Sequence, residues 1–235
     1  MKRTKNPAKE AEYRKRAADL VAQMTLHEKV SQMLSWAPAI ERLGIPAYNW
    51  WSEGIHGVGR AGTATVFPQA IGMAAAFDED MMEQVGNAVG VEARGKYNMC
   101  RAHGDRDIFK GLTVWAPNIN IFRDPRWGRG HETYGEDPFL TSRLGVRFVE
   151  GMQGDDPDYL QAAACAKHFA VHSGPESDRH HFNAIVSKQD LWETYLPAFR
   201  ALVKEAGVEA VMGAYNRTNG EPCCGSKTLL KDCLL

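Results

Sequence analysis

The amino-acid sequence predicts an α/β fold that is built around a parallel sheet. Apolar segments of strand length alternate with amphipathic segments of helix length in the second half of the chain. The strand-like segments are apolar without alternation, which is typical of parallel strands that helices cover on both faces. A chain of 235 residues can bury a large core, and we expect residues 1–235 to form a single domain.

The composition is that of an ordinary globular protein. Hydrophobic residues make up 44% and charged residues 24%, and 28 Lys and Arg against 29 Asp and Glu give a net charge of -1. This balance provides no basic field for nucleic acid and no polybasic patch for a membrane surface, so we expect neither as a partner. The basic N-terminus is not followed by a continuous apolar segment, and we therefore expect no signal peptide and a cytoplasmic location.

The first half of the chain predicts three helices and a short strand. Residues 8–35 carry a helical apolar pattern that breaks at Thr25, where Glu28 completes a capping box for a second helix. Residues 43–51 predict a short strand that ends in aromatic residues. A third helix begins after Asp78, because apolar residues follow it at helical spacing: Met82, Val85 and Val89.

The second half alternates between strand and helix. Strands are predicted in the segments 112–122, 160–172 and 208–216, and helices in the segments 137–154 and 187–207. Ser187 and Asp190 form a capping box at the start of the last helix, Pro197 should bend it and Gly207 should end it.

Polar residues stand where the extended segments end. Lys167 and His168 close one apolar strand, Tyr215 follows another, and Glu53 follows the aromatic segment. Since parallel sheets bind ligands at the carboxyl ends of their strands, we expect these side chains to converge. No glycine-rich phosphate loop occurs in the sequence, and we expect no nucleotide or other cofactor.

Two charged motifs offer groups that a sugar site needs. In WWSEGIHGVGR, Glu53 follows paired tryptophans, and aromatic faces beside a carboxylate suit a sugar ring and its hydroxyls. The alternative is an aromatic cluster beside a solvated Glu53. In FRDPRWGRGHETYGEDP, interleaved arginines and carboxylates indicate an ion-pair network, from which one arginine could face the pocket.

The segment KHFAVHSGPESDRHHFNA admits two interpretations. His168 and His172 have the spacing of a metal pair on a helix, which raises a metal-dependent hydrolase as an alternative. The strand-like context, the missing metalloprotease motif and the neighbouring Lys167 argue against a metal, and we expect none. Lys167 and His168 instead offer hydrogen-bond donors and an acceptor to a neutral polyol.

Six motifs in unbroken order, from about Thr25 to the last residue, resemble the N-terminal domain of family 3 glycoside hydrolases, the β-glucosidase and β-xylosidase group. They are MTLHEKVSQM, WWSEGIHG, VFPQAIGMAAAFD, APNINIFRDPRWGRGHETYGEDP, AKHFAVHSGPE and VMGAYN. The resemblance implies a retaining β-glycosidase with a (β/α)8 TIM-barrel-like domain, which we expect to be incomplete at its C-terminal end.

The resemblance also implies which residues bind the nonreducing-end sugar. They are Glu53, Arg129, Lys167, His168, Arg179, Met212 and Tyr215. Many β-glucosidases of the family have Asp where Glu53 stands, and the longer side chain would occupy space near the C6 hydroxymethyl group of a hexose. The implied substrate is therefore a β-linked oligosaccharide or glycoside with a terminal xylosyl or glucosyl residue, the pentose being favoured by about 1–3 kcal/mol.

In the family, the nucleophilic aspartate lies on a strand after the AYN segment and the acid/base commonly comes from a later domain. We therefore expect the nucleophile after Leu235, no catalytic carboxylate within the chain, and no turnover without the C-terminal domain. Two alternatives remain: a noncatalytic sugar-binding module, and a β-N-acetylglucosaminidase that uses Asp178 and His180 as an acid/base dyad.

Overall fold

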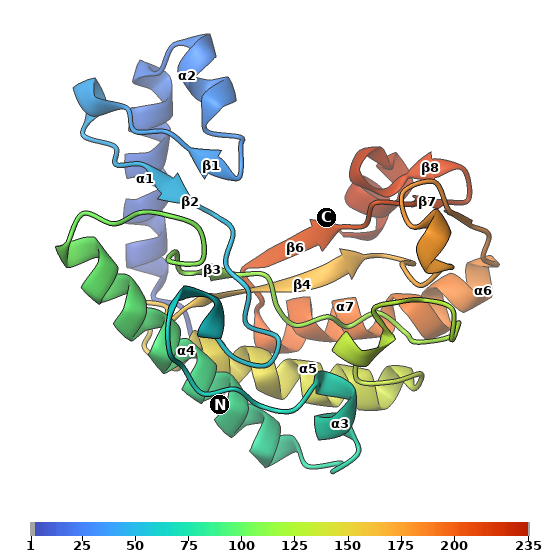
Figure 1. Cartoon of the computed structure of the whole chain (residues 1–235). Coiled ribbons are helices and arrows are strands. Elements are labelled where there is room, and N and C mark those ends of the chain that lie inside the picture. Colours follow the sequence, from blue (N-terminus) through green and yellow to red (C-terminus); the bar gives the residue numbers. More distant parts are fainter. Residues whose placement is uncertain (1–2, 235) are drawn as a thin grey trace.

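A computed structural model of the chain describes residues 3–234 (Figure 1). Its centre is a parallel sheet in the order β3 (Thr113–Val114), β4 (Ala163–Phe169), β6 (Ala210–Gly213). The α/β class and the parallel strands expected from the alternating segments are therefore confirmed. The sheet is small, because the segment 112–122 forms a regular ladder only at its start.

Pro117 explains why that segment is not a continuous strand. Proline has no N–H to donate to a ladder. The chain around it nevertheless runs beside β4, because Cys165 N donates to Ala116 O at 2.8 Å and Ile119 N donates to Lys167 O at 2.9 Å. The predicted strand is thus shorter than expected, although the backbone keeps its place in the sheet.

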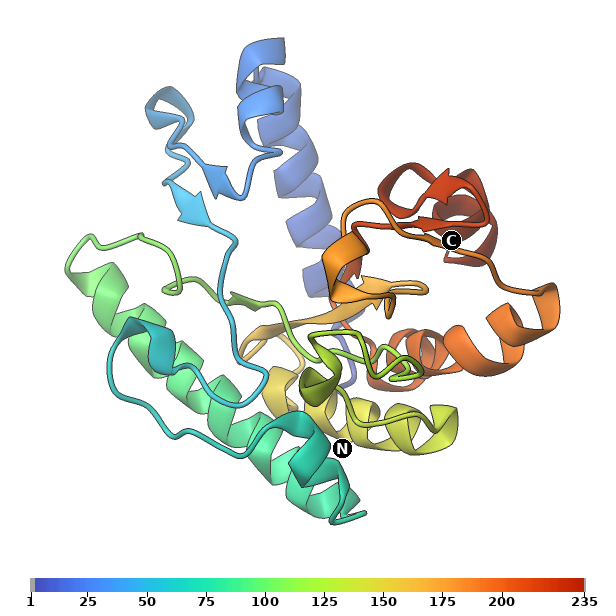
Figure 2. The same ribbon diagram turned by 45° about the vertical axis from the view of Figure 1, so that its right-hand side comes forward.

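Two long helices, α4 (Glu79–Ala102) and α5 (Pro138–Gln153), lie side by side along one side of the sheet (Figures 1 and 2). Both begin where the sequence predicts, since Asp78 and Asp137 each accept a hydrogen bond from a backbone N–H of the first turn. Helix α3 (Ala70–Ala74) precedes α4.

Glycines let α4 and α5 approach closely. A Cβ atom on Gly86 would lie 2.3 Å from Phe148 O, and one on Gly151 would lie 2.1 Å from Glu83 O. Gly86 and Gly90 lower the intrinsic helix propensity of α4, but the close backbone contact with α5 requires them.

A continuous helical segment follows β4. It contains α6 (Lys188–Asp190), α7 (Pro197–Ala201) and wider turns between and after them. Before Pro197, Leu196 N donates to Leu191 O five residues back, at 2.9 Å, so that the helix widens where proline interrupts it. Asp190 N donates to Ser187 Oγ at 3.0 Å, which confirms the predicted cap, and Gly207 ends the segment with φ 64°.

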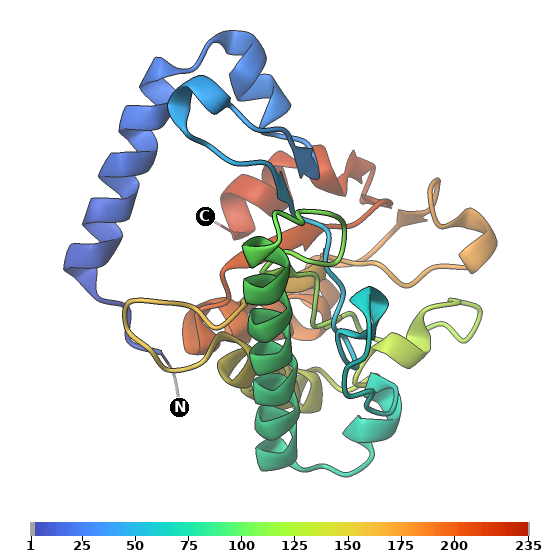
Figure 3. The same cartoon turned by 60° about the vertical axis from the view of Figure 1, so that its left-hand side comes forward.

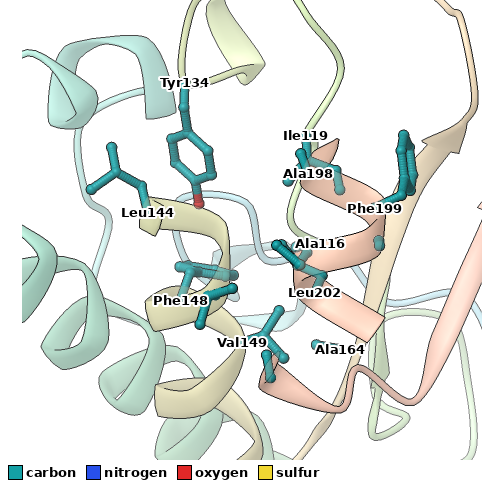
Figure 4. Close-up of a cluster of buried hydrophobic side chains, with 14 of the residues drawn as sticks. Ala116, Ile119, Tyr134, Leu144, Phe148, Val149, Ala164, Ala198, Phe199 and Leu202 are labelled. Carbon is teal, nitrogen blue, oxygen red and sulfur yellow. The ribbon is translucent and has the colours of Figure 1, made fainter. Parts of the chain in front are cut away.

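The core lies between this helical segment, α5 and the sheet. Figure 4 shows side chains of α5 meeting those of the helical segment that contains α7 and those of the strands. It labels Leu144, Phe148, Val149, Ala164, Ala198, Phe199 and Leu202 among others. All of these are buried and belong to one cluster, and such burial contributes about 1.5–3 kcal/mol for each large apolar side chain.

Two small sheets complete the fold. Strands β1 (Trp36–Ala37) and β2 (Tyr48–Asn49) pair antiparallel. Strand β7 (Arg217–Thr218) pairs in parallel with β5 (Asn183–Ala184) and antiparallel with β8 (Glu221–Pro222). The second of these sheets joins the loops that follow β4 and β6.

Helices α1 (Pro7–Gln23) and α2 (Leu26–Ser31) stand away from the sheet and its covering helices (Figure 3). The predicted capping box at Thr25 and Glu28 is confirmed. The apolar residues of this part are not buried, however: Val21 is 47% exposed and Met33 85%. No helix within residues 3–234 combines the length and the apolar character needed to cross a bilayer.

Candidate functional site

The sheet places the predicted residues at the carboxyl ends of its strands. Lys167 and His168 lie at the end of β4, and Met212 lies opposite Lys167 on β6. Tyr215 follows β6 by two residues. Glu53 follows Ser52, which pairs in parallel with Val114 of β3. The structure thus places these residues at the same edge of the sheet.

His168 is held by a buried amide. Asn120 Oδ1 accepts from His168 N at 2.8 Å and lies 3.0 Å from His168 Nδ1, while Asn120 Nδ2 donates to the carbonyls of His168 and Ala170. Because both amide hydrogens are used in this way, Nδ1 of His168 carries the proton and donates to Asn120. The register of β4 against β6 shifts between Lys167 and Phe169, leaving His168 outside the ladder.

Arg129 contacts the other ring nitrogen of His168. Arg129 Nη1 lies 3.2 Å from His168 Nε2, and since a guanidinium cannot accept, Nε2 must. Burial, together with the charges of Lys167 and Arg129, holds the pKa of His168 well below its usual value, so the ring is neutral. Both ring nitrogens of His168 are therefore bonded to protein groups. From the sequence we expected them to be available to a polyol, and in the structure they are not.

Glu132 holds Arg129 from the opposite side. Arg129 Nε and Nη2 each donate to a different oxygen of Glu132 at 2.7 Å, and Asn118 Nδ2 donates to the same carboxylate at 3.4 Å. Burial alone would raise the pKa of Glu132, but the hydrogen bonds and charge of Arg129 outweigh it and lower the pKa. The sequence placed Glu132 only in a general ion-pair network.

Lys167 is buried at the edge of this group, with 5% of its surface exposed. Burial, followed by the charge of Arg129, lowers the pKa of Lys167 to about 8, whereas Glu132 and Glu53 act in the opposite direction. The ammonium is therefore poised between its charged and neutral forms under mildly alkaline conditions.

Glu53 is fixed from two sides. Trp51 Nε1 donates to Oε1 at 3.2 Å and Arg60 Nη1 donates to Oε2 at 3.0 Å. The ring of Trp51 stacks on Trp115 with centroids 4.8 Å apart. Glu53 therefore has two partners, although its side chain stays 37% exposed, and Arg60 and Trp115 are neighbours that the motif alone did not reveal.

These groups meet at a cavity of about 230 Å³, whose lining includes Glu53, Arg129, Lys167 and Glu132. Gln69 and His131, which the sequence did not suggest, also line it. Drug-sized ligands occupy pockets of roughly 300–1,000 Å³, so this volume suits a smaller polar ligand. A separate hollow of about 240 Å³ beside Trp192 and Phe199 is mainly apolar and contains none of the predicted residues.

The other predicted residues lie outside this cavity lining. Tyr215 is 59% exposed, with its ring 5.0 Å from that of His180. Arg179 pairs with Glu176 at 2.9 Å. Within residues 3–234, no hydrogen bond or ion pair joins Asp178 to His180, and no group of three metal-ligating side chains is found.

The chain matches the family model described as the glycosyl hydrolase family 3 N terminal domain over residues 16–235. It is 52% identical over 225 residues to a xylan 1,4-beta-xylosidase of Xylanibacter ruminicola, covering 94% of this chain and 26% of that protein. It is 48% identical over 236 residues to the probable beta-D-xylosidase 7 of Arabidopsis thaliana, covering 92% of this chain and 30% of that protein.

Two solved structures are similar in fold and sequence. A GH3 exo-beta-xylosidase, XlnD, in complex with a xylobiose aziridine probe matches with a TM-score of 0.84 and 38% identity, covering 94% of this chain and 29% of that one. DesR, a beta-glucosidase from Streptomyces venezuelae in complex with D-glucose, matches with a TM-score of 0.76 and 36% identity, covering 93% and 27%. The chain thus spans less than a third of these relatives' lengths.

Proposed function

The chain belongs to glycosyl hydrolase family 3, and from this premise we propose that the protein is a retaining β-glycosidase that releases terminal nonreducing β-D-xylosyl or β-D-glucosyl residues, with xylosyl preferred. The observation that carries the proposal is the meeting of Glu53, Arg129 and Lys167 at one small polar cavity beyond the strand ends. Such a cavity can bind one neutral sugar ring through its hydroxyl groups.

Each cavity group has a defined part in binding. Lys167 supplies ammonium donors, and the carboxylate of Glu53 accepts hydroxyl protons in charge-assisted hydrogen bonds. Arg129 is oriented in advance by Glu132 and His168, so little conformational entropy is lost when a hydroxyl meets it. We assign Tyr215, Met212 and Arg179 to the rim of the same sugar site.

The proposed preference for xylose rests on Glu53 and on the residues that contact its carboxylate. Trp51 and Arg60 fix the carboxylate, and the stacked rings of Trp51 and Trp115 back it. The hydrogen bonds from Trp51 and Arg60 favour this position of the carboxylate, which leaves less room for the C6 hydroxymethyl group of glucose. One such group changes selectivity by about 1–3 kcal/mol, or roughly 10–200-fold.

The reacting carboxylates are assigned to residues beyond Leu235. Retaining hydrolysis needs two carboxyl groups about 5–5.5 Å apart, one as nucleophile and one as acid/base. The two carboxylates at the cavity are already engaged, Glu53 with Trp51 and Arg60, and Glu132 with Arg129. The three parallel strands are, in this proposal, part of a (β/α)8 barrel that the rest of the protein completes.

The test is a comparison of kcat/KM for aryl β-xyloside and aryl β-glucoside with the protein at its natural length. We expect turnover of both and a higher kcat/KM for the xyloside. A strong preference for the glucoside would overturn the pentose assignment, and no turnover of either would overturn the glycosidase.

A noncatalytic sugar-binding module is the second candidate, because both cavity carboxylates are bound by cationic or N–H donors and neither is free to react. Calorimetry with xylose on the same protein separates the two functions. Binding without turnover supports the module, whereas binding with turnover supports the enzyme.

A further inference from the structure

His172 and Asn216 connect the loops that follow β4 and β6. His172 Nδ1 lies 3.0 Å from Asn216 Oδ1, and the two side chains are 3% and 1% exposed. Asn216 Nδ2 donates to the carbonyls of Val171 and Arg217, each at 2.8 Å. Because both amide hydrogens are thus committed, Oδ1 faces the imidazole and Nδ1 of His172 is the donor.

This contact begins where the sheet ends. The last paired residues of the two strands are Phe169 and Gly213, and Ala214 N donates to Phe169 O at 2.8 Å. Beyond that point, the hydrogen bond from His172 to Asn216 and the one from Asn216 Nδ2 to Val171 O hold the β6 loop against the β4 loop. The backbone on one side of Tyr215 is therefore anchored by Asn216.

Tyr215 needs such an anchor because packing does not fix it. Its side chain is 59% exposed, and its ring is 6.2 Å from that of His172. The ring of His172 also lies edge-on to His168 with centroids 4.8 Å apart. One imidazole thus lies against both Tyr215, which we assign to the rim of the sugar site, and His168, which orients Arg129, and it does so without lining the cavity.

We propose that His172 is a positioning residue, which sets Tyr215 in place for the sugar through its hydrogen bond to Asn216. The inference rests on the proposed function for the role of Tyr215. Burial lowers the pKa of His172 to about 4, which agrees with a neutral ring that donates from Nδ1.

Three substitutions at one position test this. His172→Phe keeps an aromatic ring of similar size but removes the donor. His172→Gln keeps a polar amide but places it at the level of Nε2, away from Asn216. His172→Asn places an amide N–H near the position of Nδ1 and can restore the bond.

With the protein at its natural length and an aryl β-xyloside, we expect the Phe and Gln variants to lose about 10–100-fold in kcat/KM, mainly through kcat, since small displacements of positioning groups carry costs of this size. The Asn variant should retain most of the activity. Equal losses in all three variants, or no loss in the Phe and Gln variants, would overturn the proposal. Thermal midpoints are measured in parallel, so that lost stability is not taken for lost positioning.

A second readout does not depend on activity. Nitrogen-15 NMR of histidine-labelled protein should show His172 as the neutral Nδ1–H tautomer near neutral pH, with the signal assigned by its absence in His172→Asn. The opposite tautomer would overturn the hydrogen bond itself. If the wild-type protein turns over neither xyloside nor glucoside while this tautomer is present, the proposed function fails and the contact between the loops stands.

Discussion

The guanidinium of Arg129 contacts both oxygens of Glu132, with nitrogen to oxygen distances of 2.7 Å on each side. This paired geometry fixes the plane of the guanidinium and leaves Nη1 directed at His168. A flexible side chain on a loop is thereby held rigidly beside the cavity. The position of the arginine is consequently set by two partners that do not themselves need to touch the sugar.

Glu132→Gln should weaken xylose binding about tenfold or more, because one charged partner of a part-buried pair is lost and Arg129 keeps its charge without a counterion. Calorimetry on the protein at its natural length measures the affinity. Asp19→Asn, which breaks the exposed ion pair with Lys15, serves as the control and should leave affinity unchanged. An unchanged affinity in Glu132→Gln would show that Arg129 does not depend on Glu132.

Raising the pH through about 8 should reduce the affinity for xylose, because Lys167 then loses the proton that makes it a charged donor. Calorimetric titrations at intervals across this range give the apparent pKa. Lys167→Met should bind more weakly and without this pH dependence. Wild-type affinity that stays constant through the range would contradict a donor role for Lys167.

The same lysine should affect stability in the opposite direction. Its pKa is about 8 in the folded chain, below the ordinary value of 10.5. Between these values the unfolded chain binds more protons, so stability rises with pH across that window, and below pH 8 the buried ammonium opposes folding. Chemical unfolding of wild type and Lys167→Met as a function of pH gives the difference between their unfolding free energies, wild type minus variant, which should rise across this window. Groups common to both proteins cancel in this difference, among them Cys165, whose raised pKa acts in the opposite direction.

Glu53→Asp should shift selectivity from xyloside toward glucoside by about tenfold or more in the ratio of kcat/KM values, since the shorter carboxylate frees space near C6. Glu12→Asp on the exposed face of α1 should leave the ratio unchanged. A ratio that stays the same in Glu53→Asp would move the source of selectivity to another residue.

Gly151→Ala should destabilise the protein by about 1–3 kcal/mol, because the new methyl group would lie 2.1 Å from Glu83 O of the neighbouring helix. Gly95→Ala on α4 has no atom within 4 Å of its new Cβ and should instead stabilise the helix by up to about 1 kcal/mol. Thermal unfolding of both variants checks that the stability falls in Gly151→Ala and rises in Gly95→Ala.

Local signals in the sequence were sufficient for the longer helices and for strands β4 and β6. The helix starts at Thr25 and at Asp78 could be predicted because the capping side chains lie within one turn of the helix ends that they cap. Asn118 and Asn120 could also have been recognised as residues that hold the site together, because residues two apart on an extended segment share a face. The sequence did not show that, among residues 3–234, α1 and α2 contain no buried residue.

The sequence by itself determined the alternation of helix and strand and the placing of Lys167 and His168 at one strand end and of Tyr215 just after another, because periodicity and capping act over a few residues. Only the tertiary structure decided the partners at those ends. His168 meets Arg129 and Asn120, which lie 39 and 48 residues away along the chain. Sheet register brings such groups together, and register depends on pairing between distant segments that no local pattern records.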